Sequence, residues 1–317
     1  MTMKKISILI PTYNEEAVLG KLFMRLTALA DNTKEYEFEF FFVNDGSKDN
    51  TLEIIKDHAE IDTRVSYLNL SRNFGKEIAM IAALDHVSGD ATVIIDADLQ
   101  DPPELIPEMI EWWEKGYDDV YAKRRSRHGE SWFKKASSKL FYATLQSVTR
   151  IPIQKDTGDF RLLDKRAVEA LKKIRESQRY TKGYFSWIGF KKKEITYNRD
   201  ARAAGQSKWN YFSLVNLAIE GIVSFSTAPL RLATLIGSFV ALAAFVYLIV
   251  IVIKTTVFGT NLAGYPSTMA VILFLGGAQL LSLGIIGEYV GRIFNETKNR
   301  PLYLIEELHI GTRKKTR

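Results

Sequence analysis

The sequence contains no cysteine and only four histidines, and both shortages restrict the chemistry that the chain can perform. Without cysteine there is no disulfide framework and no thiolate to serve as a nucleophile or a metal ligand. The histidines are scattered and lack the spacing of a metal site, at His58, His86, His128 and His309. A metal bound by this chain therefore has mainly oxygen ligands, which favours Mg²⁺ or Mn²⁺.

Several targeting and binding signals are missing as well. The chain has neither a Walker-type phosphate-binding loop nor a GxGxxG motif, which argues against an ATPase or a dinucleotide-binding protein. Residues 1–10 lack the long apolar segment of a secretory signal, so we expect the first domain to stay in the cytoplasm. The net charge of +6 is compatible with nucleic acid, an anionic membrane surface or phosphorylated substrates.

What the sequence does contain, from Lys4 to about Tyr197, is a regular alternation of short apolar runs and amphipathic stretches. The apolar runs predict strands at Ile6–Ile10, Phe38–Val43, Val65–Leu70, Ala91–Ile95 and Val120–Ala122. The amphipathic stretches predict helices at Glu15–Ala30, Thr51–Glu60, Gly75–Val87 and Pro103–Lys115. Repeated βα units predict an α/β fold with a mostly parallel sheet and helices on both faces. Polar clusters follow four of these strands, where such sheets bind ligands.

The composition changes near Tyr211. Tyr211–Phe225 is mostly apolar and predicts an amphipathic helix at a membrane interface. Leu232–Ile253 and Ser267–Gly287 carry no charge, and each is long enough to cross a hydrocarbon core of about 30 Å. The alternative is a pair of buried core helices, but core helices normally have a polar face and these two segments have none.

Basic residues flank this predicted hairpin, whereas its connecting loop, Lys254–Pro266, has one charge. The positive-inside rule therefore puts both flanks in the cytoplasm, and a membrane, not nucleic acid, is the expected anionic partner. We predict a multi-pass protein of the inner (plasma) membrane with both termini cytoplasmic. Its expected parts are a cytosolic domain (1–210), an interfacial helix (211–228), a hairpin (229–291, with spans at about 232–253 and 267–287) and a basic tail (292–317).

The strongest local signal for chemistry is Asp96–Glu104, directly after a predicted strand. Asp96 and Asp98 leave the strand two residues apart, so their carboxylates can share one divalent cation, and the amide oxygen of Gln100 can complete the protein ligands. A metal with open positions can also bind a diphosphate. The alternative is a helix N-cap, which explains Asp101 before two prolines but requires neither Asp96 nor Asp98.

Other strand ends carry residues suited to a nucleotide. Pro11, Tyr13 and Glu15 can stack on a base and hydrogen-bond to it, or they can form a turn and a helix cap. Asp45 can accept hydrogen bonds from ribose hydroxyls or a base N–H, and Gly46 permits a tight turn. Lys76 either adds positive charge near a diphosphate or belongs to the start of a helix.

Four motifs together carry a family resemblance. PTYNEE (11–16), NDGSKDNT (44–51), SRNFGKE (71–77) and DADLQDPPE (96–104) occur in the order and spacing of family 2 glycosyltransferases with the Rossmann-like GT-A fold. More narrowly, the chain resembles polyprenyl-phosphate glycosyltransferases, which include dolichol-phosphate mannose synthase and, closer, the GtrB-type bactoprenol glucosyltransferases. The resemblance covers nearly the whole chain, including the hairpin.

The resemblance implies roles for individual residues. Pro11, Tyr13, Glu15 and Asp45 match positions that hold the nucleoside, with Lys76 nearby, and Asp96, Asp98 and Gln100 match the metal and diphosphate site. Residues 121–131 resemble the loop that binds the acceptor. The residues expected to receive the lipid phosphate are Arg124, Arg127, Lys135 and Ser138. The alternative for any one arginine is a solvated basic face that only touches anionic lipid.

Asp159, with Asp156 nearby, matches the family's catalytic carboxylate. A phosphomonoester has a second pKa of about 6, so the acceptor is already largely anionic at neutral pH and scarcely needs a general base. Asp159 and Asp156 therefore either accept a proton or orient a basic residue or the sugar hydroxyls. Arg202 and Lys208 match a segment that either closes over the diphosphate or anchors the chain at the membrane.

The predicted reaction is inverting transfer of a hexose, with glucose as the first choice, from UDP to undecaprenyl phosphate. The same reaction with N-acetylglucosamine, galactose, an aminoarabinose derivative or GDP-mannose is the nearest alternative. A processive polysaccharide synthase is a weaker one, because only two spans follow the domain. A non-catalytic channel or scaffold is weaker still, because the Asp96, Asp98 and Gln100 set is intact. Small residues in the second span, and the tetrameric relatives, predict a homo-oligomer.

Overall fold

A computed structural model of the chain describes residues 3–125, 157–177, 179, 181–197, 226–258 and 264–311. Several predictions lie outside these residues. They are the site roles of Arg127, Lys135, Ser138, Asp156, Arg202 and Lys208, and nearly all of the interfacial helix at 211–228.

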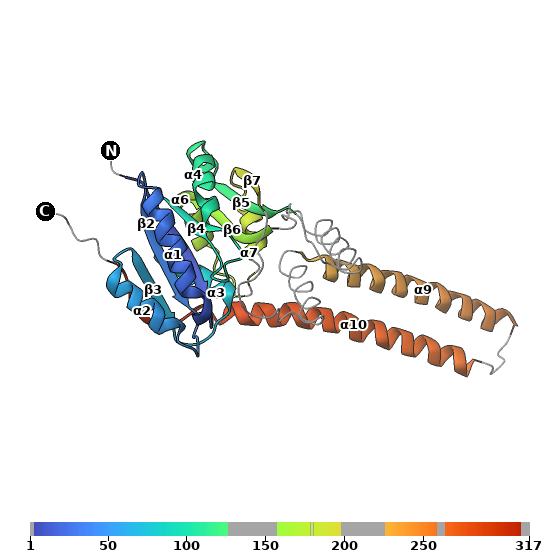
Figure 1. Cartoon of the computed structure of the whole chain (residues 1–317). Helices are drawn as coiled ribbons and strands as arrows, with labels where there is room; N and C mark the ends of the chain where they lie inside the picture. The colour runs from blue at the N-terminus through green and yellow to red at the C-terminus, as the bar shows by residue number, and fades with distance from the viewer. Residues whose placement is uncertain are drawn as a thin grey trace.

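Among the described residues, an eight-stranded sheet forms the centre of the domain that lies beside the hairpin (Figure 1). Its strands are β1 (Lys5–Thr12), β2 (Glu37–Asn44), β3 (Val65–Leu70), β4 (Ala91–Ile94), β5 (Asp119–Arg124), β6 (Thr157–Asp164), β7 (Lys192–Tyr197) and β8 (Ile305–His309). Their order in the sheet is β7-β5-β6-β4-β1-β2-β3-β8. Neighbours β4, β1, β2 and β3 are parallel, while β6 and β8 run antiparallel to their neighbours. The predicted mostly parallel sheet is confirmed.

The chain order creates a switch point between β1 and β4. From β1 the chain proceeds outward through β2 and β3, and it then returns to the other side of β1 as β4. The connections leave these two central strands in opposite directions across the sheet. In open α/β sheets this arrangement opens a space beyond the carboxyl ends of the two strands, where ligands bind.

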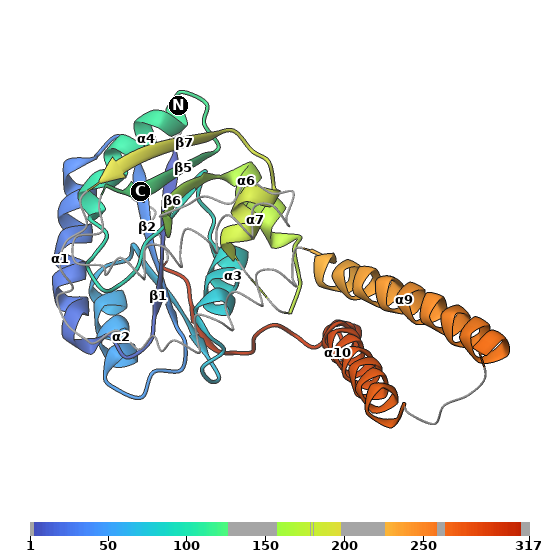
Figure 2. The same ribbon diagram turned by 90° about the vertical axis from the view of Figure 1, so that its right-hand side faces the viewer.

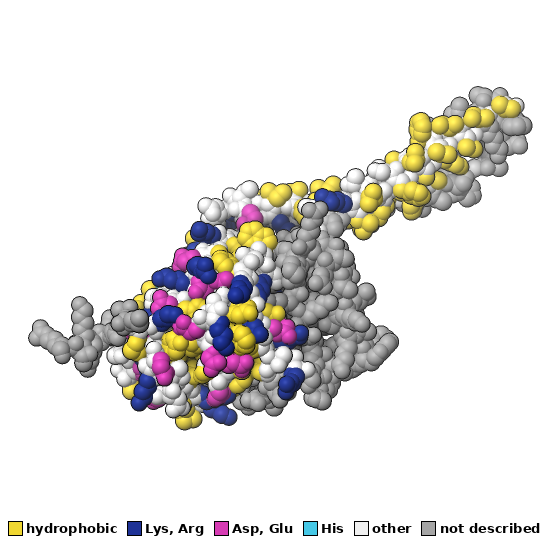
Figure 3. Space-filling model, turned by 90° about the horizontal axis from the view of Figure 1, so that it is seen from above, with side chains coloured by type: hydrophobic (Ala, Val, Ile, Leu, Met, Phe, Trp, Pro, Cys, Tyr) yellow, Lys and Arg dark blue, Asp and Glu magenta, His cyan; other side chains and the backbone are white. Residues whose placement is uncertain are grey.

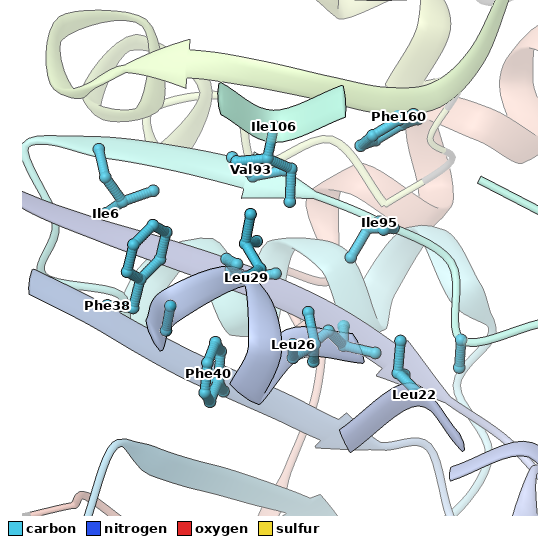
Figure 4. Packing of buried hydrophobic residues seen from close by; sticks show 14 of the residues in the cluster. Ile6, Leu22, Leu26, Leu29, Phe38, Phe40, Val93, Ile95, Ile106 and Phe160 are labelled. Atoms are coloured by element: carbon cyan, nitrogen blue, oxygen red, sulfur yellow. The ribbon is translucent and has the colours of Figure 1, made fainter. Parts of the chain in front are cut away.

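One face of the sheet is covered by α1 (Glu16–Asn32), α2 (Thr51–Ile61) and α4 (Ile106–Glu114), the last preceded by the 3₁₀ turn η1 (Pro103–Leu105). Helix α1 buries Leu22, Leu26 and Leu29, spaced by four and three residues, so one apolar stripe faces the sheet. Figure 4 shows this stripe against Phe38 and Phe40 of β2.

The opposite face is covered by α3 (Lys76–His86), α6 (Lys165–Lys172) and α7 (Thr181–Trp187) (Figure 2). Residues 79–84 of α3 are all buried, because the helix lies between the sheet and neighbouring elements. Helix α3 starts at the carboxyl end of β3, so its first residue, Lys76, is held in a rigid position at the edge where the switch point lies.

Beyond this domain, α9 (Ala228–Phe258) and α10 (Tyr265–Thr297) run side by side as a hairpin that projects away from the sheet (Figure 1). Each contains a stretch long and apolar enough to cross a membrane, Pro229–Tyr247 and Phe274–Thr297. Large apolar side chains on the hairpin are exposed, among them Leu235 (68%), Phe239 (74%) and Leu280 (71%) (Figure 3). The alternative of two buried core helices is therefore wrong, and the apolar surface indicates membrane association.

The C-terminal segment differs from its prediction. The sequence predicts a basic tail over 292–317, but α10 continues to Thr297 and Ile305–His309 forms β8, which pairs antiparallel with β3. The chain thus returns from the hairpin to the domain. Tyr303 Oη donates to Asp85 at 2.7 Å, and Ser177 N–H donates to Glu296 at 2.7 Å. These two hydrogen bonds hold the segment between α10 and β8 against the domain. A short strand with few apolar residues at a sheet edge has a weak sequence signal, which explains the miss.

Candidate active site

The loops after β1 and β2 are joined to each other by side-chain hydrogen bonds. Asn14 has a positive φ of 56°, and its N–H donates to Ser47 Oγ at 3.0 Å. Lys48 N–H donates to Asn14 Oδ1 at 2.8 Å, and Glu15 N–H donates to Thr51 Oγ1 at 2.8 Å. Together these contacts bring the predicted nucleoside-binding segments, residues 11–15 and 44–51, to one edge of the sheet, where the Tyr13 side chain is 36% exposed.

Asp45 lies within this edge but is buried, with only 3% of its surface exposed. Its two carboxylate oxygens accept hydrogen bonds from the N–H groups of Phe74 (2.7 Å) and Gly75 (2.9 Å). Burial raises the pKa of Asp45, while those two N–H groups partly offset the rise. Asp45 therefore links the end of β2 to the start of α3, a structural role that its sequence position did not reveal.

Gly46 makes this approach possible. Its φ is +64°, and a Cβ at this position would lie 2.5 Å from the carbonyl carbon of Arg72. Any larger residue would both strain the backbone and push the Arg72 segment away. The tight turn that the sequence predicts at Gly46 is confirmed.

Lys76 joins two carboxylates that come from different strands. Its Nζ lies 2.5 Å from Asp96 Oδ1 and 2.6 Å from Asp159 Oδ2. The register explains the meeting: Ile94 of β4 pairs with Arg161 of β6, so two residues further along the antiparallel pair Asp159 faces Asp96. Three residues that the sequence predicts for the site are thus brought into one cluster.

The charges in this cluster determine how its groups titrate. Burial is the largest single influence and would raise the pKa of Asp159, but Lys76, together with Lys182 and Arg161, outweighs it, and the net result is a pKa well below the usual range. Burial would lower the pKa of Lys76, yet the carboxylates of Asp159 and Asp96 raise it above its ordinary value. Asp159 is therefore ionised, and Lys76 protonated, throughout the neutral range. A carboxylate this acidic is a poor proton acceptor.

The loop after β4 turns sharply at the other predicted metal residues. Leu99 has a positive φ of 62°, and Gln100 N–H donates to Asp98 Oδ1 at 3.1 Å. Within the described part of the chain, the buried Gln100 Oε1 has no hydrogen-bond partner. A non-glycine residue in this backbone conformation is strained, and such strain often occurs at functional sites.

Asp101 does not act as the helix cap that was the alternative interpretation of this segment. The residue at the start of the 3₁₀ turn is Pro102, and no side chain caps it. Asp101 is buried and accepts a hydrogen bond from the hydroxyl of Tyr197, at the end of β7. It therefore ties the loop after β4 to the edge strand β7.

Known proteins resemble the chain over nearly its whole length. The sequence profile described as glycosyl transferase family 2 matches residues 7–172, which includes every motif after β1, β2, β3 and β4. Over 307 residues the chain is 46% identical to the SfII prophage-derived bactoprenol glucosyl transferase of Shigella flexneri, covering 97% of this chain and 99% of that protein. The chain belongs to glycosyl transferase family 2.

The hairpin of this glycosyltransferase also has a family match, and further relatives were found. The profile of the GtrB C-terminal hairpin matches residues 228–293. An uncharacterized glycosyltransferase of Synechocystis sp. is 48% identical over 304 residues, with 96% of this chain and 95% of that one covered. Among solved structures, glucosyl-3-phosphoglycerate synthase of Mycobacterium tuberculosis matches with a TM-score of 0.47 and 16% identity, over 70% of this chain and 79% of that one.

Among the described residues of the glycosyltransferase, two arginines lie close to Asp159 in the sheet, and the sequence predicts a role for one of them. Arg124, at the end of β5, has its Nη2 only 3.2 Å from where a Cβ on Gly158 would lie, so its guanidinium lies beside the residue that precedes Asp159. Arg161 was missed. It is fully buried, pairs with Asp119 at 3.1 Å, and its guanidinium lies 3.6 Å from the centre of the Phe185 ring. The signal was available, because Arg161 follows Asp159 by two residues and so lies on the same side of β6.

One feature of the loop after β4 in this glycosyltransferase fits a divalent cation: a buried oxygen that lacks a partner in the part of the chain that the structure describes. Gln100 Oε1 is a buried carbonyl oxygen without a hydrogen-bond partner among the described residues, and Asp96 and Asp98 of the same loop are partly exposed. The described residues contain no cluster of three or more acidic or histidine side chains able to hold a metal alone. A hard cation here therefore needs further oxygen ligands from a substrate, as a diphosphate provides.

Proposed function

We propose that this glycosyltransferase transfers glucose from UDP-glucose to a polyprenyl phosphate at the cytoplasmic face of the membrane, with inversion at the anomeric carbon. The observation that carries the proposal is the Asp96–Lys76–Asp159 cluster at the switch point of the sheet, on a chain that also carries an exposed apolar hairpin. The full-length similarity to bactoprenol glucosyl transferases supports both the sugar and the lipid acceptor.

In the proposed step, an anionic oxygen of the lipid phosphate attacks the anomeric carbon from the face opposite UDP. The new carbon–oxygen bond forms as the bond to the β-phosphate oxygen breaks, and UDP leaves with the electron pair. No proton needs to be removed, because the second pKa of a phosphomonoester is about 6. The acidity that Lys76 imposes on Asp159 agrees with a step that has no general base.

The chain's own residues then have separate roles. Lys76 supplies a fixed positive charge between Asp96 and Asp159, where the diphosphate of the donor would lie, and stabilises its developing negative charge. Asp159 Oδ1 has no hydrogen-bond partner among the described residues, so it can accept one from a sugar hydroxyl. Arg124, with Arg127, Lys135 and Ser138, would receive the acceptor phosphate. Arg202, Lys208 and Asp156 would complete the diphosphate and sugar contacts.

Asp96, Asp98 and Gln100 would hold Mg²⁺ or Mn²⁺ together with the donor. When bound, the cation supplies positive charge that neutralises the departing diphosphate. Pro11, Tyr13, Glu15 and Asp45 would surround the nucleoside at the adjoining edge of the sheet.

The hairpin would span the inner membrane twice, with the catalytic domain and both chain ends in the cytoplasm. Arg231 at the start of α9 and Arg292 near the end of α10 support this orientation, because cations favour the cytoplasmic side. Glu288 pairs with Arg292 at 3.0 Å, which suits a residue at the membrane boundary. Such anchoring keeps the domain at the surface where the lipid phosphate lies. Glycines at 276, 277, 284, 287 and 291 have open space around them and support helix contacts within a homo-oligomer, which we propose to be a tetramer.

The donor specificity is tested with the purified full-length chain, undecaprenyl phosphate and a panel of labelled sugar nucleotides, followed by extraction of lipid-linked label. We expect UDP-glucose to be the best donor, and EDTA to abolish the transfer. Preference for UDP-N-acetylglucosamine, UDP-galactose or GDP-mannose would correct the sugar but keep the reaction. Full activity of Asp98→Ala, or full activity in EDTA, would remove the metal from the proposal.

A further inference from the structure

The edge strand β8 contains an irregularity beside the proposed nucleotide site. Asn69 pairs with Glu307, but the next residue, Leu70, pairs with Ile305, so Glu306 is an extra residue in the strand. A bulge of this kind re-aims a side chain that would otherwise point to the other face of the sheet. Glu306 and Glu307 consequently both contact the same face of β3: Glu306 meets Asn69, and Glu307 meets Tyr67.

Glu306 ends a line of hydrogen bonds that starts at the turn after β2. Ser47 N–H donates to Asn44 Oδ1 at 3.4 Å, and Asn44 Nδ2 donates to Asn69 Oδ1 at 2.8 Å. Asn69 Nδ2 then donates to Glu306 Oε2 at 2.9 Å. All three donors point the same way, toward a carboxylate. In such a series each bond polarises the next, and the last bond is strengthened by the charge.

The middle of this line is buried, which makes its geometry specific. Asn44 is 1% exposed and Asn69 is 6% exposed, so their amides depend on protein partners. Asn44 immediately precedes Asp45 and Gly46, and Ser47 Oγ accepts a hydrogen bond from Asn14 N–H in the loop after β1. The line therefore reaches the two loops that would hold the nucleoside.

We propose that Glu306 is a positioning residue for the donor nucleotide: through Asn69 and Asn44 it sets the conformation of the turn at residues 44–47. This inference rests on the proposed function. It means that the strand that follows the membrane hairpin contributes directly to the order of the nucleotide site, on the opposite side of β3 from the rest of the sheet. In this role Glu306 acts through its hydrogen bond with Asn69 and not by contact with the donor.

The test compares variants of two neighbouring glutamates in the full-length chain. Glu306→Ala removes the acceptor for Asn69, whereas Glu306→Gln keeps a carbonyl oxygen in its place. Glu307→Ala is the matched control on the same strand, because it removes contacts with Tyr67 of β3 (2.7 Å) and Lys56 of α2 (2.8 Å) and leaves the line intact. Binding of UDP is measured by calorimetry, and the kcat and KM for UDP-glucose by the transfer assay.

For Glu306→Ala we expect the Kd for UDP and the KM for UDP-glucose to rise about fivefold with kcat unchanged, as befits one indirect hydrogen bond. Glu306→Gln and Glu307→Ala should retain wild-type Kd and KM. The double variant Glu306→Ala/Asn69→Ala should bind UDP no more weakly than Asn69→Ala, because both changes break the same line. If the alanine variant does not fold, Glu306→Thr replaces it, since threonine favours strands but is too short to reach Asn69.

Equal UDP binding by Glu306→Ala and wild type would overturn the inference. So would equal losses in Glu306→Ala and Glu307→Ala, because that result indicates a strand that only stabilises the fold. If the wild-type chain transfers glucose but Glu306→Ala and Glu307→Ala bind UDP equally well, this inference fails and the proposed function stands. A wild-type chain that binds no UDP overturns the proposed function and this inference together.

Discussion

At the scale of single residues, Lys76 determines the charge balance of the site. It is the cation shared by Asp96 and Asp159, and both carboxylates raise its pKa. Lys76→Met leaves two carboxylates facing each other without a cation, so we predict a loss in kcat on the order of 100-fold, the usual effect of removing one preorganised charge. The measurement is the transfer rate at saturating donor. Lys21→Met, on the exposed side of α1, is the control and should retain full activity.

Asp159 gives a prediction about pH. Lys76 holds the pKa of Asp159 well below its usual range, so the carboxyl is ionised across the neutral range. Its titration therefore adds no rise or fall to the pH profile of the transfer rate between about pH 5 and 9. We expect the rate to rise with pH through about 6, where the acceptor phosphate loses its second proton. The residual activity of Asp159→Asn should keep that same limb. A limb that disappears in Asp159→Asn would identify Asp159 as a general base after all.

The sequence predicts the members of the cluster better than their contacts. Asp96 and Lys76 are recognisable because each lies in a motif that follows a predicted strand, and Asp159 is recognisable because it matches the carboxylate of the family that the chain resembles. The meeting of Lys76 with both carboxylates depends on the register of β4 against β6, which pairs residues far apart in the chain (Ile94 with Arg161). The hydrogen bonds that Phe74 and Gly75 donate to Asp45 likewise depend on a loop that follows another strand. Local patterns hold no information on such pairings.

At the scale of elements, two glycines should respond oppositely to the same substitution. Gly46→Ala brings a Cβ within 2.5 Å of the Arg72 backbone at φ +64°, and we expect a loss of about 1–3 kcal/mol in the free energy of unfolding. Gly20, in the middle of α1, has no atom within 4 Å of the position that a Cβ would occupy, so Gly20→Ala should gain about 0.5–1 kcal/mol. Denaturant unfolding followed by tryptophan fluorescence measures both. Equal effects would contradict the described turn.

The helices and strands also show which elements sequence patterns can locate on their own. The strands β1, β2 and β3 and the helices α1, α2 and α3 lie within a few residues of their predicted bounds, because their apolar periods are strong and uninterrupted. Strand β8 was missed for two reasons. Its partner β3 lies 240 residues earlier in the chain, as the Tyr67–Glu307 hydrogen bond illustrates, and two adjacent glutamates interrupt its alternation. Because of the bulge at Glu306, both glutamates contact side chains on the same face of β3.

At the scale of the whole molecule, the hairpin and the catalytic domain are connected more than once. The chain enters the hairpin through α9, leaves it through α10 and returns to the sheet as β8, while Tyr289 near the end of α10 donates to the carbonyl of Ser226 at 2.7 Å. These connections hold the base of the hairpin closed. A domain fixed to a membrane element in this way suits an acceptor whose phosphate lies at the bilayer surface.

The most direct measurement of the central claim is transfer of label from UDP-glucose into the organic phase by the purified full-length chain in lipid vesicles. With undecaprenyl phosphate in the vesicles, the account predicts a lipid-linked glucose with the anomeric configuration inverted, and loss of nearly all label with Lys76→Met. Without undecaprenyl phosphate it predicts no lipid-linked label. Wild-type protein that hydrolyses UDP-glucose but never labels the lipid, or that labels it with retained configuration, would contradict the account.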